Sequence, residues 1–159
     1  HDLETKRRKK EDKLMSGNQQ VSYRRLFIMR KDLNMSPGKL AAQTAHCGEA
    51  YWLQMIRSGE KDGDSVKLNI PEEIFEGYIN DSIVKTICQA KNKSKLMGAR
   101  QDALDLGLVE DVDFGFIRDN CYTELKPEEL DGTVITGIWF CPLPDDLSHE
   151  ISKHFQLYR

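Results

Sequence analysis

The sequence predicts an α/β fold, in the form of a single layered domain with a small four-stranded mixed sheet flanked by helices. Three observations lead to this prediction. The chain has 159 residues, which is room for one ordinary domain with a substantial core. Short runs of strand character alternate along it with segments of helical periodicity. No internal repeat interrupts that order, and such alternation is typical of helices layered on a sheet.

The first expected strand spans residues 23–30, with the sequence YRRLFIMR. Within it, residues 26–29 form a continuous apolar run that is bounded by charged side chains. A strand that alternates between core and solvent would show apolar and polar residues in turn, whereas a continuous run indicates burial on both faces. We therefore expect this strand near the centre of the sheet.

Ser36 and Pro37 mark the start of a long helix that we expect to end at about Arg57. Serine is a favoured N-cap residue, and proline suits the first helical position. Small and aromatic residues recur in this helix at spacings of three and four, which predicts the face that packs on the sheet. That face comprises Ala41, Ala45, Gly48, Trp52 and Ile56.

The later elements follow from the same patterns of periodicity and of terminating residues. In chain order they are a loop (58–64), a short helix (70–79), a second strand (83–88), a helix (94–106), a third strand (112–118), a fourth strand (133–140) and a last helix that begins at Pro144. No helix separates the third and fourth strands, so we expect them to pair antiparallel across residues 120–132.

Residues 1–20 differ in composition from the remaining chain and set a domain boundary. They hold six basic and four acidic residues and almost no apolar ones, so we expect a mobile basic tail. Its KRRKK run has two interpretations, a solvated tail or a patch for nucleic acid or targeting. Residues 21–159 form the expected domain, which is mildly acidic, so any nucleic-acid site must be a local patch. No run of 18 apolar residues occurs, and we expect a cytoplasmic protein without a membrane segment.

Several common functional sites are absent from the sequence. It has no P-loop, no GxGxxG fingerprint and no GxSxG nucleophile elbow. The four cysteines contain no CxxC pair, so we expect free thiols rather than a zinc site. His149 and His154 lie five residues apart and leave a helix on different sides, so we expect no metal site there either.

Two stretches remain as candidates for chemistry. Lys39, Gln43 and His46 lie at i, i+4 and i+7, on one face of the long helix. Lys39 lies in its first turn, where the helix dipole already favours anions, so a phosphate or an oxyanion would complete this arrangement. The alternative is a solvated lysine, a polar glutamine and an ordinary histidine. The second stretch, residues 117–124, follows a strand end, where α/β proteins often bind ligands; its alternative is a polar loop.

These residues carry a resemblance to a known family. The stretch over residues 29–46, MRKDLNMSPGKLAAQTAH, resembles the signature of the second, archaeal and eukaryotic type of peptidyl-tRNA hydrolase. The matching positions are Arg30, Asp32, Leu33, Met35, Gly38, Lys39, Ala42, Gln43 and His46. Asp119, Thr123 and Glu124 resemble the family's later D-x-G-x-T-[QE] segment. The resemblance covers roughly residues 21–159.

The resemblance implies hydrolysis of the ester that joins a peptide to tRNA, without a metal or an organic cofactor. It implies catalytic roles for Lys39, Asp119, Thr123 and His46, and substrate contacts from Gln43, Ser36, Gly38, Asn120 and Arg30. The expected partner is peptidyl-tRNA, and a homodimer is an open alternative. Lys39 suits an oxyanion or a phosphate, while Asp119 would orient or deprotonate water, or hold Lys39. The identity of the nucleophile or base stays open.

The sequence departs from the family pattern at four places. Cys121 replaces the usual glycine, which is unexpected if the backbone there needs a positive φ. Glu124 replaces the usual glutamine and places an acid before a polyanionic substrate. The turn at residues 137–142 is bulkier than the family's, and residues 58–82 form a longer connection. These changes keep a second interpretation open, namely a non-catalytic RNA- or protein-binding member that retains the fold.

Overall fold

The computed structural model describes residues 3–5, 7–8 and 21–159. Residues 3–5 and 7–8 have helical backbone. The rest of the expected mobile tail, residues 1–2, 6 and 9–20, lies outside the described residues, and so does most of the KRRKK run. The prediction about the tail therefore stays a prediction.

The described part of the chain is built on a mixed sheet of six strands, with a separate two-stranded hairpin. Its four long strands are β1 (Tyr23–Arg30), β4 (Lys85–Ala90), β5 (Phe114–Asp119) and β6 (Val134–Phe140). The strand order is β5-β6-β1-β4-β8, so the expected central position of β1 is confirmed. β1 pairs parallel with β4 and antiparallel with β6. β5 and β6 pair antiparallel, as the absence of a helix between them predicted.

The prediction of four strands was wrong because it missed two very short ones. β7 (Leu143–Pro144) pairs with β1, and β8 (Gln156–Leu157) pairs with β4 at the sheet edge. Each has two residues, which is too short to produce any alternation of apolar and polar side chains. Only the position of the chain beside an existing strand makes these segments part of the sheet.

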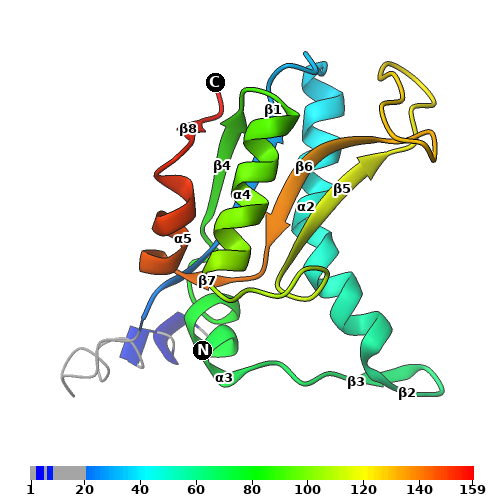
Figure 1. The fold of residues 1–159 in the computed structure, drawn as a ribbon. Coiled ribbons are helices and arrows are strands. Elements are labelled where there is room, and N and C mark those ends of the chain that lie inside the picture. Colours follow the sequence, from blue (N-terminus) through cyan, green and yellow to red (C-terminus); the bar gives the residue numbers. More distant parts are fainter. Residues whose placement is uncertain (1–2, 6, 9–20) are drawn as a thin grey trace.

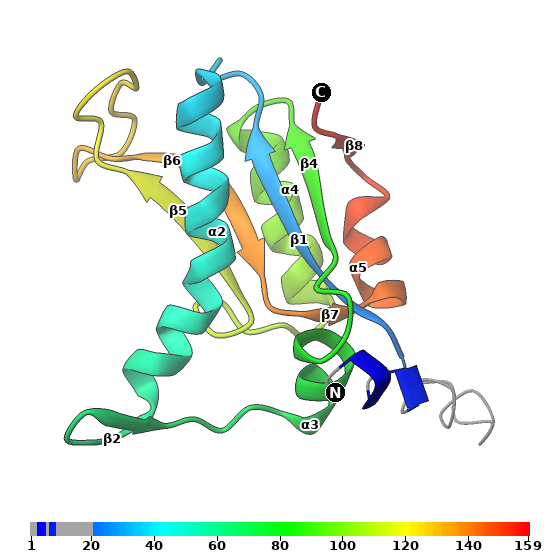
Figure 2. The same cartoon turned by 180° about the vertical axis from the view of Figure 1, so that it is seen from behind.

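Helices cover both faces of the sheet, so the α/β class is confirmed. The long helix α2 (Pro37–Ser58) lies on one face, while α4 (Lys93–Asp105) and α5 (Asp145–Ser152) lie on the other (Figures 1 and 2). The second half of α2 extends beyond the sheet and leads into the hairpin of β2 (Glu60–Asp62) and β3 (Ser65–Lys67). We predicted a loop here; all six strand residues are exposed and Val66 is the one apolar residue among them, so no core-facing pattern marks them.

The short helix expected over residues 70–79 consists of two pieces, α3 (Glu72–Ile74) and the π-helical turn η1 (Phe75–Ile79). β4 and β5 each begin two residues later than predicted, because the residues before them leave the extended conformation. Ile83 has φ +40°, which does not belong to a strand, so β4 starts after it. Before β5, the backbone N–H groups of Val112 and Asp113 donate to the carbonyl of Val109, so residues 111–113 form a turn.

The predicted packing face of α2 was only partly right: Trp52 packs against the core, but Ile56 is exposed. Its buried residues are Gln43, Cys47 and Tyr51, whereas Ala41 and Ala45 are exposed. Gln43 was not part of the predicted packing face, but its amide is held by polar partners inside the protein. A pattern based on hydrophobicity therefore missed part of the side of the helix that faces the core.

The core holds one arginine without any exposed surface. Arg25 on β1 donates hydrogen bonds to the carbonyl oxygens of Phe140, Gly48 and Cys47, and its guanidinium lies 5.8 Å from the centre of the Tyr51 ring. Burial lowers the pKa of Arg25, but its partners are carbonyls and a ring, which satisfy a cation without a second charge. This side chain ties α2 to the sheet. In the described residues, no helix combines the length and apolar character needed to cross a membrane.

Candidate active site

The candidate site lies at one end of the sheet, where α2 begins and β5 ends. β5 and β1 are both antiparallel to β6, so they run in the same direction and their carboxyl ends lie together. The chain leaves β1, turns, and starts α2 at Pro37, which places the first turns of α2 beside the end of β5. Two segments that are about 80 residues apart in sequence thereby meet, as the argument from strand ends predicted.

An ion pair between Lys39 and Asp119 lies at the centre of this site. The Lys39 Nζ atom is 2.7 Å from Asp119 Oδ1, and both side chains are mostly buried, with 16% and 11% of their surface exposed. An ammonium has three N–H donors, and this is the one hydrogen bond that Lys39 Nζ makes in the described part of the chain. Two donors of a partly exposed cation therefore remain for a ligand.

Gln43 supports Asp119 from the next turn of α2. Its Nε2 atom donates to Asp119 Oδ1 at 3.4 Å, and its Oε1 atom accepts from Thr136 Oγ1 at 2.7 Å. Thr136 on β6 is fully buried, and its hydroxyl donates to the amide oxygen of Gln43. The amide nitrogen of Gln43 is therefore the end that faces the Asp119 carboxylate. Thr136 was not among the predicted site residues, because an isolated threonine in a strand carries no local signal of this role.

The start of α2 is tied to the loop that follows β5. The Ser36 hydroxyl accepts a hydrogen bond from the Lys39 backbone N–H at 3.3 Å, which confirms Ser36 as the N-cap. Ser36 in turn donates from its hydroxyl and its backbone N–H to the two carboxylate oxygens of Glu124. These bonds lower the pKa of Glu124. The acid that departs from the family pattern thus complements a helix start that has no acidic residue of its own.

Cys121 has φ +61°, so the backbone at this position is in the left-handed region that favours glycine. The Cys121 backbone N–H donates to Asp119 Oδ2 at 3.0 Å, which explains why the chain turns here. Partial burial, and then the charge of Asp119, raise the pKa of the Cys121 thiol, so this thiol is neutral near pH 7. Cys121 therefore shapes the site through its backbone.

Gly38 leaves open space beside the first turn of α2. A Cβ atom at this position would meet no atom within 4 Å, so packing does not require a glycine there. Glycine near a helix start lowers helix stability relative to alanine. The open surface beside Lys39 is the side from which a ligand can approach the backbone.

The structure places three further predicted site residues at the rim rather than in the cluster. His46, Thr123 and Asn120 are all exposed, and none of them makes a hydrogen bond to Lys39, Gln43 or Asp119. His46 shares the helical face of Lys39, and the other two belong to the loop around Cys121. Over the described residues, no group of three or more His, Cys, Asp or Glu side chains has an arrangement that would hold a metal ion.

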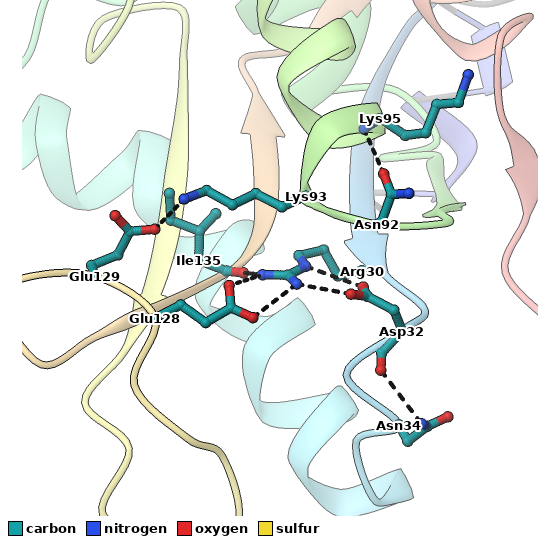
Figure 3. Close-up of polar contacts among 9 residues, drawn as sticks. All are labelled: Arg30, Asp32, Asn34, Asn92, Lys93, Lys95, Glu128, Glu129 and Ile135. Atoms are coloured by element: carbon teal, nitrogen blue, oxygen red, sulfur yellow. Dashed lines mark hydrogen bonds and ion pairs between the residues drawn. The ribbon is translucent and has the colours of Figure 1, made fainter.

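Arg30 lies in a separate, closed cluster (Figure 3). Its guanidinium is 3% exposed and donates five hydrogen bonds, two to Asp32, two to Glu128 and one to the Ile135 carbonyl. A guanidinium has five N–H donors, so all of them are used. This cluster anchors the far end of the loop that follows Asp119 and carries Glu124, and Lys93 of α4 adds an ion pair to Glu129.

The fold and the site together define a class of protein: an α/β domain with a lysine–carboxylate pair at the carboxyl end of a mixed sheet. The family model described as "Peptidyl-tRNA hydrolase PTH2" matches this chain over residues 23–158. The chain therefore belongs to the PTH2 family of peptidyl-tRNA hydrolases.

Curated relatives agree with the family model. A protein of Thermococcus onnurineus named peptidyl-tRNA hydrolase is 29% identical over 135 residues, which cover 85% of this chain and 97% of the relative. A protein of the same name from Sulfolobus acidocaldarius is 28% identical over 130 residues, covering 82% and 95% of the two chains. A probable peptidyl-tRNA hydrolase 2 of Dictyostelium discoideum is 22% identical over 135 residues, which are 85% of this chain and 54% of that protein.

Proposed function

We propose that this chain hydrolyses the ester bond between a peptide and the terminal ribose of tRNA. Membership of the PTH2 family supports this function, as do the nearly full-length matches to relatives that carry its name. The single observation that carries the proposal is the Lys39–Asp119 pair. It combines a fixed carboxylate with an ammonium whose other two N–H donors are available to a ligand. A cytoplasmic location belongs to the same proposal, because tRNA is the substrate. The homodimer stays a prediction.

Lys39 is assigned to the oxyanion. In this reaction the oxygen of a water molecule bonds to the ester carbonyl carbon, and the carbonyl oxygen becomes negatively charged. The bond from that carbon to the ribose oxygen then breaks, the ribose oxygen takes a proton, and the peptide leaves with a carboxyl group. The Lys39 ammonium lies in the first turn of α2, where the helix dipole adds positive potential, so it suits the developing charge.

Asp119 is assigned to holding Lys39 and orienting the attacking water. Its carboxylate is fixed from three directions, by the Lys39 ammonium, the Gln43 amide and the Cys121 backbone N–H. A carboxylate held in this way keeps lone pairs directed toward the open side of the site and accepts a hydrogen bond from water. Gln43 acts through Asp119 and is therefore a positioning residue.

The exposed residues are assigned to the substrate. Thr123 is proposed as a hydrogen-bond donor, since no base among the described residues touches its hydroxyl to make it a nucleophile. His46 and Asn120 are proposed as substrate contacts at the rim, and Gly38 as the point of close backbone approach. Ser36 shapes the start of α2.

Arg30 is reassigned from substrate binding to positioning. All its donors are engaged within the protein, so no N–H of its guanidinium is left for a substrate. Its bonds to Glu128 hold the loop that follows Asp119 at the end of β5.

The test is a turnover assay with N-acetylated aminoacyl-tRNA, in which release of the free acyl amino acid is measured. We expect the wild-type chain to turn over this substrate and Asp119→Asn to be slower by about 10²-fold or more. Asp146→Asn is the matched control, because Asp146 is exposed at the start of α5 at the other end of the sheet. A folded wild-type chain without turnover would overturn the proposal, and so would equal rates for Asp119→Asn and the control.

A further inference from the structure

Four lysines lie close together at the end of the sheet that carries the candidate site. Lys31 directly follows β1, and its backbone N–H donates to the carbonyl of Ala90 at 2.8 Å. Lys91 directly follows β4, so the two lysines lie side by side at the ends of two parallel strands. Lys93 and Lys95 come next, in the first turn of α4. We call these four residues the lysine ridge.

The positive charge of the lysine ridge is only partly neutralised. Lys93 pairs with Glu129 at 2.5 Å, and Lys31 contacts a main-chain oxygen of Arg159 and lies 4.6 Å from the centre of the Tyr158 ring. Lys91 and Lys95 are exposed, and neither has a carboxylate partner in the part of the chain that the structure describes. Figure 3 shows the Lys95 side chain extending away from Glu129.

The neighbouring carboxylates do not cancel this excess. Glu128 and Asp32 are already paired with Arg30, and Glu129 is paired with Lys93. Five basic side chains, the four of the ridge and Arg30, therefore face three carboxylates in this region. The patch as a whole keeps a positive charge, even though the chain carries a net charge of −3.

The two ends of the sheet also differ in the residues that begin the helices. α2 and α4 start at the end that carries the candidate site, on opposite faces of the sheet, and neither has an acidic residue in its first turn (Figures 1 and 2). α3 and α5 start at the other end, and each has two acidic residues in its first turn. Cations near a helix start are unfavourable by themselves, so positive charge concentrated at one end of the fold suits a polyanion there.

We propose that the lysine ridge binds the phosphate backbone of the tRNA acceptor arm; this inference rests on the proposed function. The ester lies at the end of that arm, so when the ester is at Lys39 and Asp119 the duplex must cross the rim of the same end of the molecule. The ridge supplies two exposed cations, Lys91 and Lys95, that have no carboxylate partner among the described residues. Its lysines contact phosphates without reading bases, which suits an enzyme that acts on many tRNAs.

The test compares two double variants of the full chain that lose the same charge. Lys91→Ala combined with Lys95→Ala removes the two unpaired cations of the ridge, whereas Lys61→Ala combined with Lys67→Ala removes two exposed lysines from the β2–β3 hairpin at the other end. We expect the ridge variant to raise KM for N-acetylated aminoacyl-tRNA about tenfold at roughly 0.1 M salt with kcat unchanged. The slope of log(kcat/KM) against log[salt] should fall by about 1 per lysine.

Further arms of the experiment make its outcomes distinct. Lys91→Arg combined with Lys95→Arg keeps the charge and should keep the salt slope, which shows that charge rather than folding is responsible. Binding of an uncharged acceptor-stem hairpin RNA, followed by fluorescence anisotropy, tests the ridge without any turnover. If the wild-type chain binds this RNA through the ridge but hydrolyses no ester, the proposed function is wrong, whereas the proposal that the ridge binds RNA is supported. Equal KM, salt slope and RNA affinity for the ridge and hairpin alanine variants would overturn the proposal that the ridge binds tRNA.

Discussion

Two basic side chains near the same end of the sheet meet carboxylates in contrasting ways. Arg30 is 3% exposed, and each of its five N–H donors has an acceptor within the protein. Among the described residues, Lys39 makes a single hydrogen bond through its ammonium, and it keeps 16% of its side chain exposed. A saturated, buried cation stabilises the fold, whereas a cation that is fixed but incompletely paired is available to a ligand. This difference assigns Arg30 to structure and Lys39 to chemistry.

The largest expected effect is on turnover, from Lys39→Ala. It should lower kcat for N-acetylated aminoacyl-tRNA by about 10²-fold or more, because it removes the group that faces the oxyanion. The free energy of unfolding should also fall, because the mostly buried Asp119 carboxylate is left without its cation, so turnover is compared at a temperature where the variant is folded. Lys39→Arg should recover little activity, since a planar guanidinium does not replace a compact ammonium. Wild-type turnover in a folded Lys39→Ala variant would contradict the assignment.

Arg30→Ala should affect stability more than turnover. Removing a buried member of an ion pair typically costs about 3–5 kcal/mol, and the carboxylate partners here are about one-third exposed, so we expect a loss of about 2–3 kcal/mol. Urea unfolding measures this loss. Turnover at a temperature where the variant is folded should fall less than in Lys39→Ala. An unchanged free energy of unfolding would show that the closed cluster does not support the fold.

A smaller stability gain is expected at Cys121, the strained residue of the site. A side chain in the left-handed region costs about 1–2 kcal/mol, of which glycine recovers part after its own larger entropy loss. Cys121→Gly should therefore raise the free energy of unfolding by about 0.5–1 kcal/mol, with turnover kept or increased. Asn34→Gly is the matched control: Asn34 has φ +47°, and asparagine tolerates this region better, so its gain should be smaller. A less stable Cys121→Gly would contradict this account.

The loss of stability at low pH should depend on Glu128, a carboxylate of the closed Arg30 cluster. The hydrogen bond from Arg30 holds the pKa of Glu128 below its ordinary value of 4.5. A carboxyl group with a lowered pKa stabilises the folded state above the unfolded value and loses that contribution as the pH falls through the folded value. Stability should thus decrease below about pH 4.5, and less steeply in Glu128→Gln than in the exposed control Glu60→Gln. Thermal unfolding between pH 7 and pH 3 measures the two slopes, and identical slopes would exclude the role of Glu128.

Local signals in the sequence were enough for the main elements. Ser36 and Pro37 placed the start of α2, and the continuous apolar run of residues 26–29 placed β1 at the centre of the sheet. Local signals did not predict features that depend on contacts with distant parts of the chain. β7 and β8 are strands only because the chain lies beside β1 and β4, and Gln43 is buried only because Thr136 and Asp119 meet its amide.

The sequence by itself determined the family, the α/β class and the residues from which a site could be built. It determined these because caps, apolar runs and motif spacings are local properties of a chain. It assigned both Lys39 and Arg30 to the site, the first to catalysis and the second to substrate contact, and it could not show that Arg30 is fully engaged within the protein. Tertiary structure made that distinction: β5 runs parallel to β1, which brings Asp119 to Lys39 across 80 residues, and Glu128 reaches Arg30 across 98. The number of acceptors around a cation depends on the folded chain, and this number separates the two roles.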